Sequence, residues 1–299
     1  MVKNDEFHVP VMLKEVLEGL QVKPGSVVID GTLGFAGHSK EILKLIRPGG
    51  KLIGIDQDQD ALRQAKINLS AESPDIHLVH HNFVEIDQIL KNLGIKNVNA
   101  ILLDLGISSF QIDSPERGFS LRKEGPLDMR MDVSGTFKAS DIINTYTESD
   151  LADILKNFGE ERFSRRIAKF IVEERKKTTI QTTTHLAQIV VRALGIRGKS
   201  QKIHPATRTF QALRIVVNDE LNRLALTIDR AVSLLKKHGR LAVISFHSLE
   251  DRIVKTRFRE LAKEKKVQLV TKKPLYPTEE EISINPRSRS ARLRVAERV

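Results

Sequence analysis

The first hundred residues alternate between short apolar runs and amphipathic stretches. The apolar runs predict strands buried on both faces of a sheet, over residues 26–30, 51–55, 76–79 and 100–105. The amphipathic stretches have apolar side chains at helical spacing and predict helices over residues 37–46, 58–69 and 84–93. This alternation indicates a parallel sheet covered on both faces, with right-handed crossovers that bring every strand-to-helix loop to one edge. We expect ligands to bind at that edge.

After residue 105 the pattern changes. Residues 106–132 are rich in glycine, proline, serine and charge, and predict a long loop of the kind that is uncommon unless functional. Helical spacing then returns, with one helix capped by Thr147 or Ser149, an apolar stripe from Phe163 to Ile171, and another helix opened by Thr184.

The last third combines a helix with strands. The spacing predicts one long helix over 206–237, a buried strand over 240–246, a helix over 248–264, and alternating edge or antiparallel strands over 267–271 and 291–297. The sheet is therefore interrupted by a mainly helical block. We expect one discontinuous domain formed by residues 1–112 and 206–299, with residues 113–205 inserted into it.

The composition excludes several kinds of functional site. The chain has 299 residues, 40% hydrophobic and 29% charged, as globular proteins do. It has no cysteine, which excludes disulfides, thiolate metal sites and cysteine nucleophiles. No run approaches the roughly 20 apolar residues of a membrane span, and the polar N-terminus lacks the apolar core of a signal peptide. We expect a soluble cytoplasmic protein that does not bind membranes.

The formal net charge is +11, and the positive charge is clustered. Residues 175–218 contain no Asp or Glu, while the same stretch contains Arg175, Lys176, Lys177, Arg192, Arg197, Lys199, Lys202, Arg208 and Arg214. This cation run predicts a polyanionic partner, with nucleic acid favoured. A mixed, solvated face is the alternative.

A glycine-rich turn, DGTLGFAGHS, follows the first predicted strand. Its glycines, Gly31, Gly34 and Gly37, have a G-x-x-G-x-x-G spacing that does not match the G-x-G-x-x-G of a dinucleotide site, which disfavours a nicotinamide oxidoreductase. Asp30 before the turn would repel a pyrophosphate but can accept hydrogen bonds from a cationic amine. S-adenosylmethionine has an amine, a carboxylate and a sulfonium, and no phosphate. Asp56, at the end of the second strand, can accept hydrogen bonds from ribose hydroxyls; a tight turn with a helix cap is the alternative.

Eight separated segments carry a more specific pattern. They read HVPVMLKEVL from residue 8, DGTLGFAGHS from 30, DLGISSFQID from 104, RGFSLRKEGPLDMRMD from 117, YTESDLADILKNFGEERFSRRIA from 146, HPATRTFQALRIVVNDEL from 204, ISFHSLEDRIV from 244 and NPRSRSARLRVAER from 285. In this order they resemble the bacterial ribosomal RNA small-subunit methyltransferase H family, also called MraW. The resemblance implies a class I, Rossmann-like methyltransferase fold with S-adenosylmethionine as cofactor. It also implies methylation of the exocyclic N4 amino group of one cytidine in the decoding region of 16S rRNA.

The resemblance also implies roles for individual residues. The family's contacts with the methionine part of the cofactor fall at Ala36, Gly37 and His38 of this chain. Its ribose contact falls at Asp56 and its adenine contact at Phe83. Asp104 and Gln111 fall at positions near the methyl group. The chain departs from the family pattern at two places. Phe35-Ala36 stands where many members have Arg-Gly or Gly-Gly, and Phe110 stands where proline is common.

Asp104 ends the fourth predicted strand, where an acceptor can orient the cofactor or the target amine. The proline-aromatic pair that follows this position in many amino methyltransferases is missing here. Ser108 and Ser109 are further candidates for contact with the base, with turn formation as the alternative. Methylation at cytosine carbon 5 requires a cysteine, so the composition excludes that reaction.

The remaining candidates concern RNA. A cytidine in folded RNA must be splayed out to reach a buried methyl group, and we expect the inserted domain to hold the surrounding RNA. Candidate RNA contacts are Arg197, Lys199, Lys202, His204, Arg208, His247, Arg287 and Arg289, with Arg292 and Arg294 in the same basic tail. His204 and His247 have helix capping as their alternative role. The histidines at 77, 80 and 81 have poor ligand spacing, so we expect no metal.

The expected partner is 16S rRNA or the small ribosomal subunit. Two other functions stay open at this stage: a non-enzymatic RNA-binding protein that retains the fold, and a methyltransferase that acts on a different RNA. Both a monomer and a homodimer are compatible with the sequence.

Overall fold

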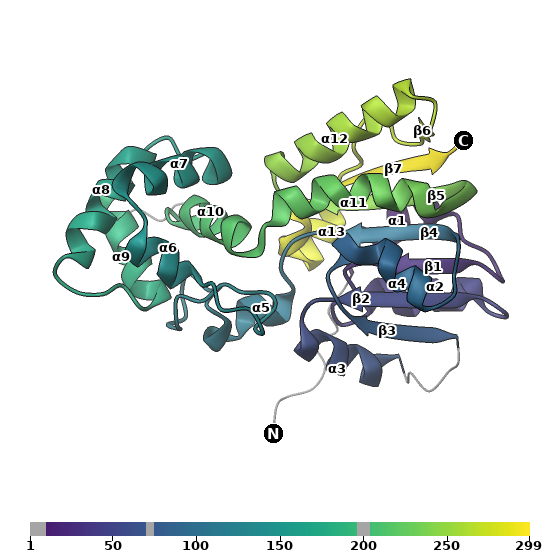
Figure 1. Cartoon of the computed structure of the whole chain (residues 1–299), viewed down its shortest axis with the longest axis horizontal. Helices are drawn as coiled ribbons and strands as arrows, with labels where there is room; N and C mark the ends of the chain where they lie inside the picture. The colour runs from purple at the N-terminus through teal and green to yellow at the C-terminus, as the bar shows by residue number, and fades with distance from the viewer. Residues whose placement is uncertain (1–9, 70–74, 196–203) are drawn as a thin grey trace. The chain divides into compact units, whose positions relative to one another are not determined.

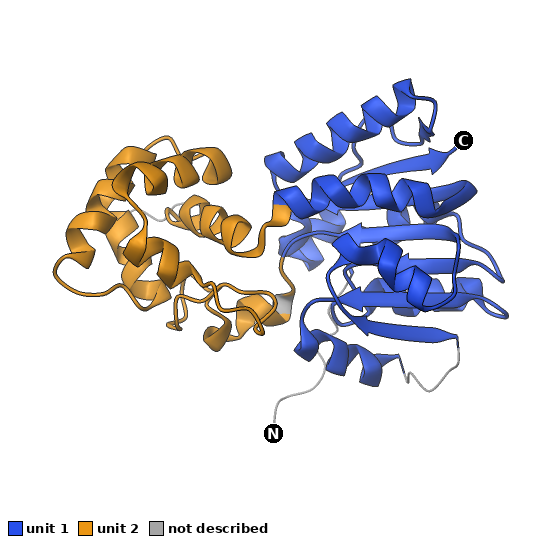
Figure 2. Cartoon of the chain, viewed as in Figure 1, with its two compact units in different colours: residues 1–106, 221–299 blue, residues 107–220 orange. Residues whose placement is uncertain are grey.

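The computed structural model of the chain describes residues 10–69, 75–195 and 204–299 (Figure 1). They divide into two compact units (Figure 2). The sheet unit comprises residues 1–106 and 221–299, and the helical unit comprises residues 107–220.

The sheet unit contains a seven-stranded sheet in the order β3-β2-β1-β4-β5-β7-β6. The strands are β1 Val27–Asp30, β2 Lys51–Asp56, β3 Ile76–His80, β4 Val98–Asp104, β5 Leu235–Ser245, β6 Val267–Leu269 and β7 Arg292–Arg298. The first five pair in parallel, whereas β7 is antiparallel to both β5 and β6. The predicted fold class, a mostly parallel Rossmann-like sheet interrupted by a mainly helical second unit, is confirmed.

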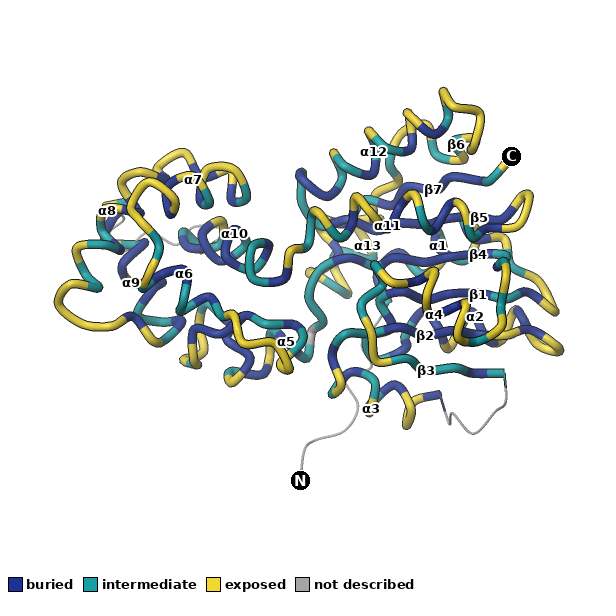
Figure 3. Tube along the Cα trace, in the orientation of Figure 1, coloured by how far each residue is buried: buried dark blue, intermediate teal, exposed yellow. Residues whose placement is uncertain are grey.

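Helices cover both faces of this sheet because its central strands are apolar on both sides (Figures 1 and 3). Val28 belongs to one buried cluster and its neighbour Ile29 to the other, as alternation along a strand requires. One face packs against α1 Leu13–Leu20, α2 Gly37–Ile46 and α3 Gln59–Asn68. The other face packs against α4 Ile86–Asn92, α11 Glu220–Leu234 and α12 Ser248–Lys263.

Four short segments lie outside the elements named so far, three in the sheet unit and one at the start of the helical unit. They are η1 Phe83–Glu85, α13 Glu279–Ile284, η3 Pro286–Ser290 and, at the start of the helical unit, α5 Ser109–Asp113. The stretch 106–132 was expected to be a loop. It contains two short helical elements, α5 and η2 Pro115–Arg117.

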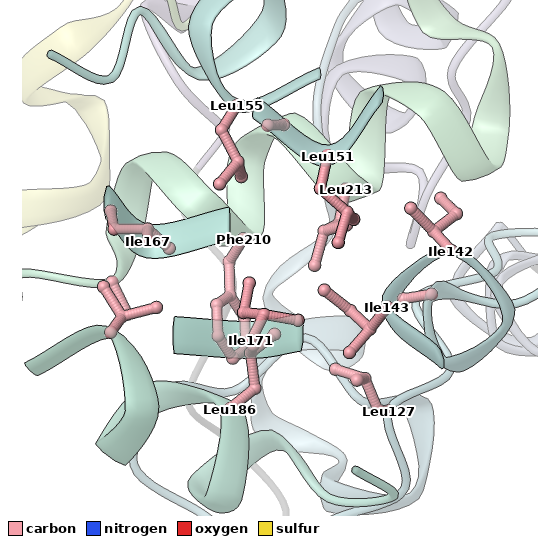
Figure 4. Close-up of a cluster of buried hydrophobic side chains, with 14 of the residues drawn as sticks. Leu127, Ile142, Ile143, Leu151, Leu155, Ile167, Ile171, Leu186, Phe210 and Leu213 are labelled. Atoms are coloured by element: carbon pink, nitrogen blue, oxygen red, sulfur yellow. The ribbon is translucent and has the colours of Figure 1, made fainter. Parts of the chain in front are cut away.

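The helical unit has its own hydrophobic core (Figure 4). Its helices are α6 Ala139–Thr145, α7 Glu148–Gly159, α8 Ser164–Arg175, α9 Thr183–Leu194 and α10 Thr207–Asn218. Each contributes side chains to this core, which include Ile142, Ile143, Leu151, Leu155, Ile167, Ile171, Leu186, Phe210 and Leu213. In α9, Thr182 rather than Thr184 is the N-cap, and its hydroxyl accepts from the backbone N–H of His185 at 3.3 Å.

The expectation of one helix over 206–237 is wrong. The segment forms α10 and α11, because Asp219 takes a left-handed backbone conformation with φ 50° between them. The chain then enters β5 at Leu235. Since Phe210 and Leu213 of α10 pack in the core of the helical unit, that unit extends to residue 220 rather than 205, and it starts at 107 rather than 113. Among the described helices, none has the length and apolar character of a membrane span.

Candidate active site

Three carboxylates lie at the carboxyl edge of the sheet. Asp30, Asp56 and Asp104 are the last residues of β1, β2 and β4, and β1 lies between the other two strands. Burial disfavours their charged forms and raises the pKa of both Asp30 and Asp56 to about 6. Burial, with the negative charges of Asp30 and Glu250, raises the pKa of Asp104 well above its usual value. The edge predicted to bind a ligand is therefore one where a positive charge would be favoured.

Asp30 organises the glycine turn. One of its carboxyl oxygens accepts from the backbone N–H of Thr32 at 3.2 Å, and the other accepts from the Ser39 hydroxyl at 2.7 Å. The side chain is buried, with the residue 1% exposed. Both oxygens thus have partners within the turn and the start of α2, and the expected contact of Asp30 with a cationic amine stays a prediction.

Gly31 and Gly37 allow close approach. A Cβ atom at Gly31 would lie 2.6 Å from Cδ2 of Leu103 and 3.4 Å from Cβ of Phe83. At Gly37 it would lie 2.8 Å from Cγ of Pro10. These glycines let the turn pack against β4 and against the residues before α1, and the absent side chains leave the turn backbone close to the sheet edge.

Gly34 and Ala36 both have positive φ angles, 51° and 64°. The left-handed conformation at Ala36 gives a physical reason why glycine is common at this place in the resembling family, because a Cβ there is strained. At this departure from the family pattern Ala36 is buried, and Asn68 Nδ2 donates to the Phe35 carbonyl at 3.0 Å.

Asp56 connects the end of β2 to the same turn. Its carboxyl oxygens accept from the backbone N–H groups of Gly34 and Asp58, each at 2.8 Å. A carboxylate has about four lone-pair sites, so each oxygen retains capacity for a hydroxyl donor. Phe83 opens η1 shortly after β3, and its Cβ atom lies against Gly31, so the structure brings this residue to the turn.

Asp104 faces His38 across the turn. Nδ1 of His38 lies 3.6 Å from Oδ2 of Asp104, and Nε2 of His38 lies 2.9 Å from the carbonyl oxygen of Val11. The backbone N–H of Asp104 donates to the Thr32 hydroxyl oxygen at 2.6 Å. Oδ1 of Asp104 is shielded from solvent and accepts no hydrogen bond from the described residues. Such an acceptor fits a ligand that donates a hydrogen bond at this point.

Ser108 and Gln111 lie in the helical unit and form a capping box at the start of α5. The Ser108 hydroxyl accepts from the backbone N–H of Gln111 at 3.2 Å, and Oε1 of Gln111 accepts from the backbone N–H of Ser108 at 3.1 Å. This geometry makes Ser108 the N-cap of α5, a local structural role, whereas turn formation was the alternative expected from the sequence. The side chain of Ser109 lies outside the described structure.

His247 is the N-cap of α12, which was its alternative role. Its Nδ1 accepts from the backbone N–H of Glu250 at 3.4 Å, while a Glu250 side-chain oxygen accepts from the backbone N–H of Phe246 at 2.8 Å. Glu250 is 2% exposed, so it adds a buried acid near the end of β5 that the sequence pattern did not identify.

The candidate RNA contacts have mixed surroundings. Arg197, Lys199 and Lys202 lie outside the described residues. His204 lines a groove of about 540 Å³ in the helical unit, and its Nδ1 accepts from the backbone N–H of Ala206 at 3.2 Å. Arg208 donates to the carbonyl of Glu160 at 3.2 Å. In the basic tail, Arg287 and Arg289 are exposed.

Several other cations have structural contacts. Arg175 donates to the carbonyls of Ile143 and Tyr146 at 2.7 and 2.6 Å. Arg192 lies 2.9 Å from Glu174 and Arg214 lies 2.8 Å from Glu220, so both pair with acids just outside the cation run. Arg294, a candidate phosphate contact of the basic tail, has a side chain that is 8% exposed and lies 2.7 Å from Asp251, so it has a structural partner.

Asn218 joins two of the recognised segments. Its Oδ1 accepts from the backbone N–H of Met131 and its Nδ2 donates to the carbonyl of Met129, both at 2.8 Å. This amide holds the stretch that reads LDMRMD against the end of α10. Periodicity could not identify this contact, since Asn218 looks like an ordinary polar residue at a helix end.

Comparison with known proteins adds an independent result. The chain matches the MraW methylase family over residues 5–299. A relative from Clostridioides difficile, named Ribosomal RNA small subunit methyltransferase H, is 47% identical over 98% of this chain and 100% of its own length. A relative of the same name from Halothermothrix orenii is 49% identical over 98% of each.

Solved structures are more distant. An rRNA methylase from Streptococcus thermophilus has a TM-score of 0.45 at 11% identity, covering 100% of this chain and 99% of that protein. A SAM-dependent O-methyltransferase from Thermotoga maritima has a TM-score of 0.46 at 11% identity, covering 100% and 68%. The conclusion therefore comes from the family match and the relatives: this chain belongs to the MraW methylase family.

Proposed function

We propose that this chain transfers a methyl group from S-adenosylmethionine to the exocyclic N4 amino group of a cytidine in the decoding region of 16S rRNA. Membership of a methylase family supports methyl transfer. The names of the relatives support ribosomal RNA of the small subunit as the substrate. The N4 position is what the resemblance of the sequence motifs implies, and a hydrogen-bond acceptor at Asp104 suits a reaction at an exocyclic amino group. A ribosomal substrate also supports action in the cytoplasm.

The cofactor site is proposed at the carboxyl edge of the sheet. Its residues are Asp30, Gly31, Gly34, Ala36, Gly37, His38, Asp56, Phe83, Asp104 and Gln111. Two observations support a fit: the three carboxylates favour a cationic ligand, and Oδ1 of Asp104 is an acceptor with no donor among the described residues. When bound, S-adenosylmethionine supplies an electrophilic methyl group on a positively charged sulfur.

The observation that carries the proposal is the position of Asp104. The amino nitrogen of cytosine is a poor nucleophile, because its lone pair is delocalised into the ring. An acceptor that binds an amino hydrogen helps to localise this pair and stabilises the positive charge that develops on nitrogen. Oδ1 of Asp104 can do this, while the chain contains no cysteine for attack at carbon 5. The principal task of the surrounding residues is to align the reacting atoms.

The helical unit is proposed to hold the RNA around the target base. Its candidate contacts are Arg197, Lys199, Lys202, His204 and Arg208, supported by the positive charge of this part of the sequence. Arg287, Arg289 and His247 of the sheet unit are proposed as further contacts. No step of the proposed reaction uses a metal ion.

Mass spectrometry of nucleosides tests the proposal. Small subunits and naked 16S rRNA that lack the modification are incubated with the protein and with cofactor carrying a labelled methyl group. We expect label in N4-methylcytidine, and loss of that label with Asp104→Asn. Label on another base or on a ring carbon would overturn the N4 assignment.

The same experiment separates the two alternatives. A non-enzymatic RNA-binding protein would retain the RNA without transferring label. A methyltransferase for another RNA would leave 16S rRNA unlabelled but label total RNA from cells that lack the protein.

A further inference from the structure

The hydrogen bond of His38 to the Val11 carbonyl fixes which of its ring nitrogens holds a proton, and the expected role of His38 as a cofactor contact does not depend on this. It is the second residue of α2, and its ring is buried, with 7% of the side chain exposed. A backbone carbonyl only accepts hydrogen bonds, so the 2.9 Å approach of Nε2 to the Val11 oxygen requires a proton on Nε2. In the neutral ring, Nδ1 therefore has a lone pair, and this lone pair faces Asp104.

The two facing atoms need a proton between them. Nδ1 of neutral His38 and Oδ2 of an ionised Asp104 are both acceptors, and at 3.6 Å they would repel each other. One proton removes the conflict, either on Asp104 as O–H directed at Nδ1 or on His38 as N–H directed at Oδ2. Among the described residues, His38 is the basic side chain that lies within 4 Å of Asp104.

The charges around the pair decide which group holds this proton. Asp30 and Glu250 are the acids that act on Asp104 across the sheet edge, and both disfavour a second negative charge there. Burial lowers the pKa of His38 to about 4, so the ring is neutral in the free protein. The proton then resides on Asp104, and its Oδ1 remains without a donor.

We propose that His38 is a positioning residue which accepts the proton of Asp104 when a cationic cofactor occupies the site. In this step the O–H bond at Oδ2 of Asp104 breaks and an N–H bond forms at Nδ1 of His38. Asp104 becomes a carboxylate and His38 becomes an imidazolium, so the net charge of the pair does not change. The inference rests on the proposed function, because the occupant is S-adenosylmethionine.

The transfer gives Asp104 the form that its role needs. A carboxylate accepts hydrogen bonds at both oxygens, whereas a protonated acid does so less well. The imidazolium keeps its bond to the Val11 carbonyl through Nε2 and can then donate to Oδ2 through Nδ1, which lies 3.6 Å away. This contact would fix the carboxylate with Oδ1 directed away from His38. Charge-assisted bonds of this kind are shorter and stronger than neutral ones.

Nitrogen NMR of the histidine rings tests the proposal directly. The full-length protein is labelled with ¹⁵N-histidine, and His38 is assigned with His38→Gln. At pH 7.5 we expect a neutral ring protonated on Nε2 in the free protein and an imidazolium in the S-adenosylmethionine complex. 5′-Methylthioadenosine, which lacks both the ammonium and the sulfonium, should leave His38 neutral. A neutral His38 in the saturated S-adenosylmethionine complex would overturn the proposal. Failure of S-adenosylmethionine to bind at all would count against the proposed function instead.

Kinetics provide a second test. His38→Gln can retain a donor to Val11 but lacks a basic group for Asp104. We expect kcat to fall about ten-fold at pH 7, with KM for the cofactor little changed, and to recover as the pH rises, since Asp104 then loses its proton to solvent. His238→Gln is the matched control, an exposed histidine that pairs with Glu297. A loss of kcat in His38→Gln that is equal at every pH would indicate a packing role alone and would contradict the proposal.

Discussion

A hydrogen bond between Asp56 and Gly34 links the ends of two neighbouring strands, because a carboxyl oxygen of Asp56 accepts from the backbone N–H of Gly34 at 2.8 Å. The last residue of β2 thereby fixes the glycine turn that follows β1. The other oxygen accepts the N–H of Asp58 at 2.8 Å and so orders the start of α3 as well. One carboxylate thus shapes both sides of the proposed ribose site.

Replacing this carboxylate should weaken cofactor binding. In Asp56→Ala the turn loses its bond at Gly34, and the proposed ribose hydroxyls lose their acceptor. Hydrogen bonds to a charged group contribute about 1.5–3 kcal/mol, so we expect Kd for S-adenosylmethionine to rise about 10- to 100-fold in calorimetry. Asp60→Ala is the control, because this half-buried carboxylate in the first turn of α3 pairs with Arg63, and the variant should bind normally. Equal affinity in Asp56→Ala and the control would refute the ribose assignment.

Gly31 should not tolerate a side chain. A methyl group there would lie 2.6 Å from Cδ2 of Leu103, which is fully buried. Overpacking of this kind costs about 1–3 kcal/mol, so we expect Gly31→Ala to lower the free energy of unfolding in urea by that amount.

Two further variants make the Gly31 result specific. Leu103→Val removes the clashing atom, so Gly31→Ala combined with it should lose less stability than the sum of the single changes. Gly135→Ala is the control, because its methyl group would lie 3.8 Å from the nearest atom, the Asp132 oxygen. Additive losses in the double variant would show that contact with Leu103 is not the cause.

Periodicity predicted the sheet edge well. The helix over 37–46 has the expected bounds, and the first four strands lie where the apolar runs placed them. Strands buried on both faces have continuous hydrophobicity, which is a strong local signal. The carboxylates Asp30, Asp56 and Asp104 could therefore be assigned to one edge from the sequence, since parallel strands end together.

The contacts of those residues could not be predicted. Helical spacing continues through Asp219, and nothing in the pattern indicates the left-handed turn that separates α10 from α11. The bond between His38 and Val11 joins a helix to a segment 27 residues earlier, which no periodicity reports. The charge count over 175–218 missed Glu174 and Glu220, because both acids lie just outside that stretch and pair with arginines inside it.

The basic segment after α9 should act on RNA rather than on the cofactor. Reversing the charge of Arg197, Lys199 and Lys202 to glutamate should weaken binding to 16S rRNA in a filter-binding assay. Each lost phosphate contact should lower the slope of log affinity against log salt by about 0.7–0.9. Calorimetry should show unchanged affinity for S-adenosylmethionine.

A matched triple reversal controls for net charge. Lys66, Lys91 and Lys263 are exposed lysines on helices of the sheet unit, and their reversal should leave the salt slope close to that of the parent protein. If the first triple variant loses cofactor affinity as strongly as RNA affinity, the segment has a structural role and the RNA assignment fails.

Asp30 should make stability depend on pH in an unusual direction. Because burial raises its pKa from 3.8 to about 6, the folded chain binds this proton more tightly than the unfolded chain, and stability falls as the pH rises from about 4 to 6. Asp30→Asn has no charge to bury, so in urea unfolding it should exceed the parent by up to about 3 kcal/mol at pH 8, with the gap closing near pH 4. Ser39→Ala removes a bond that favours the carboxylate, so its stability should fall more steeply over this range. A gap between Asp30→Asn and the parent that is independent of pH would show that Asp30 is ionised without cost in the folded chain.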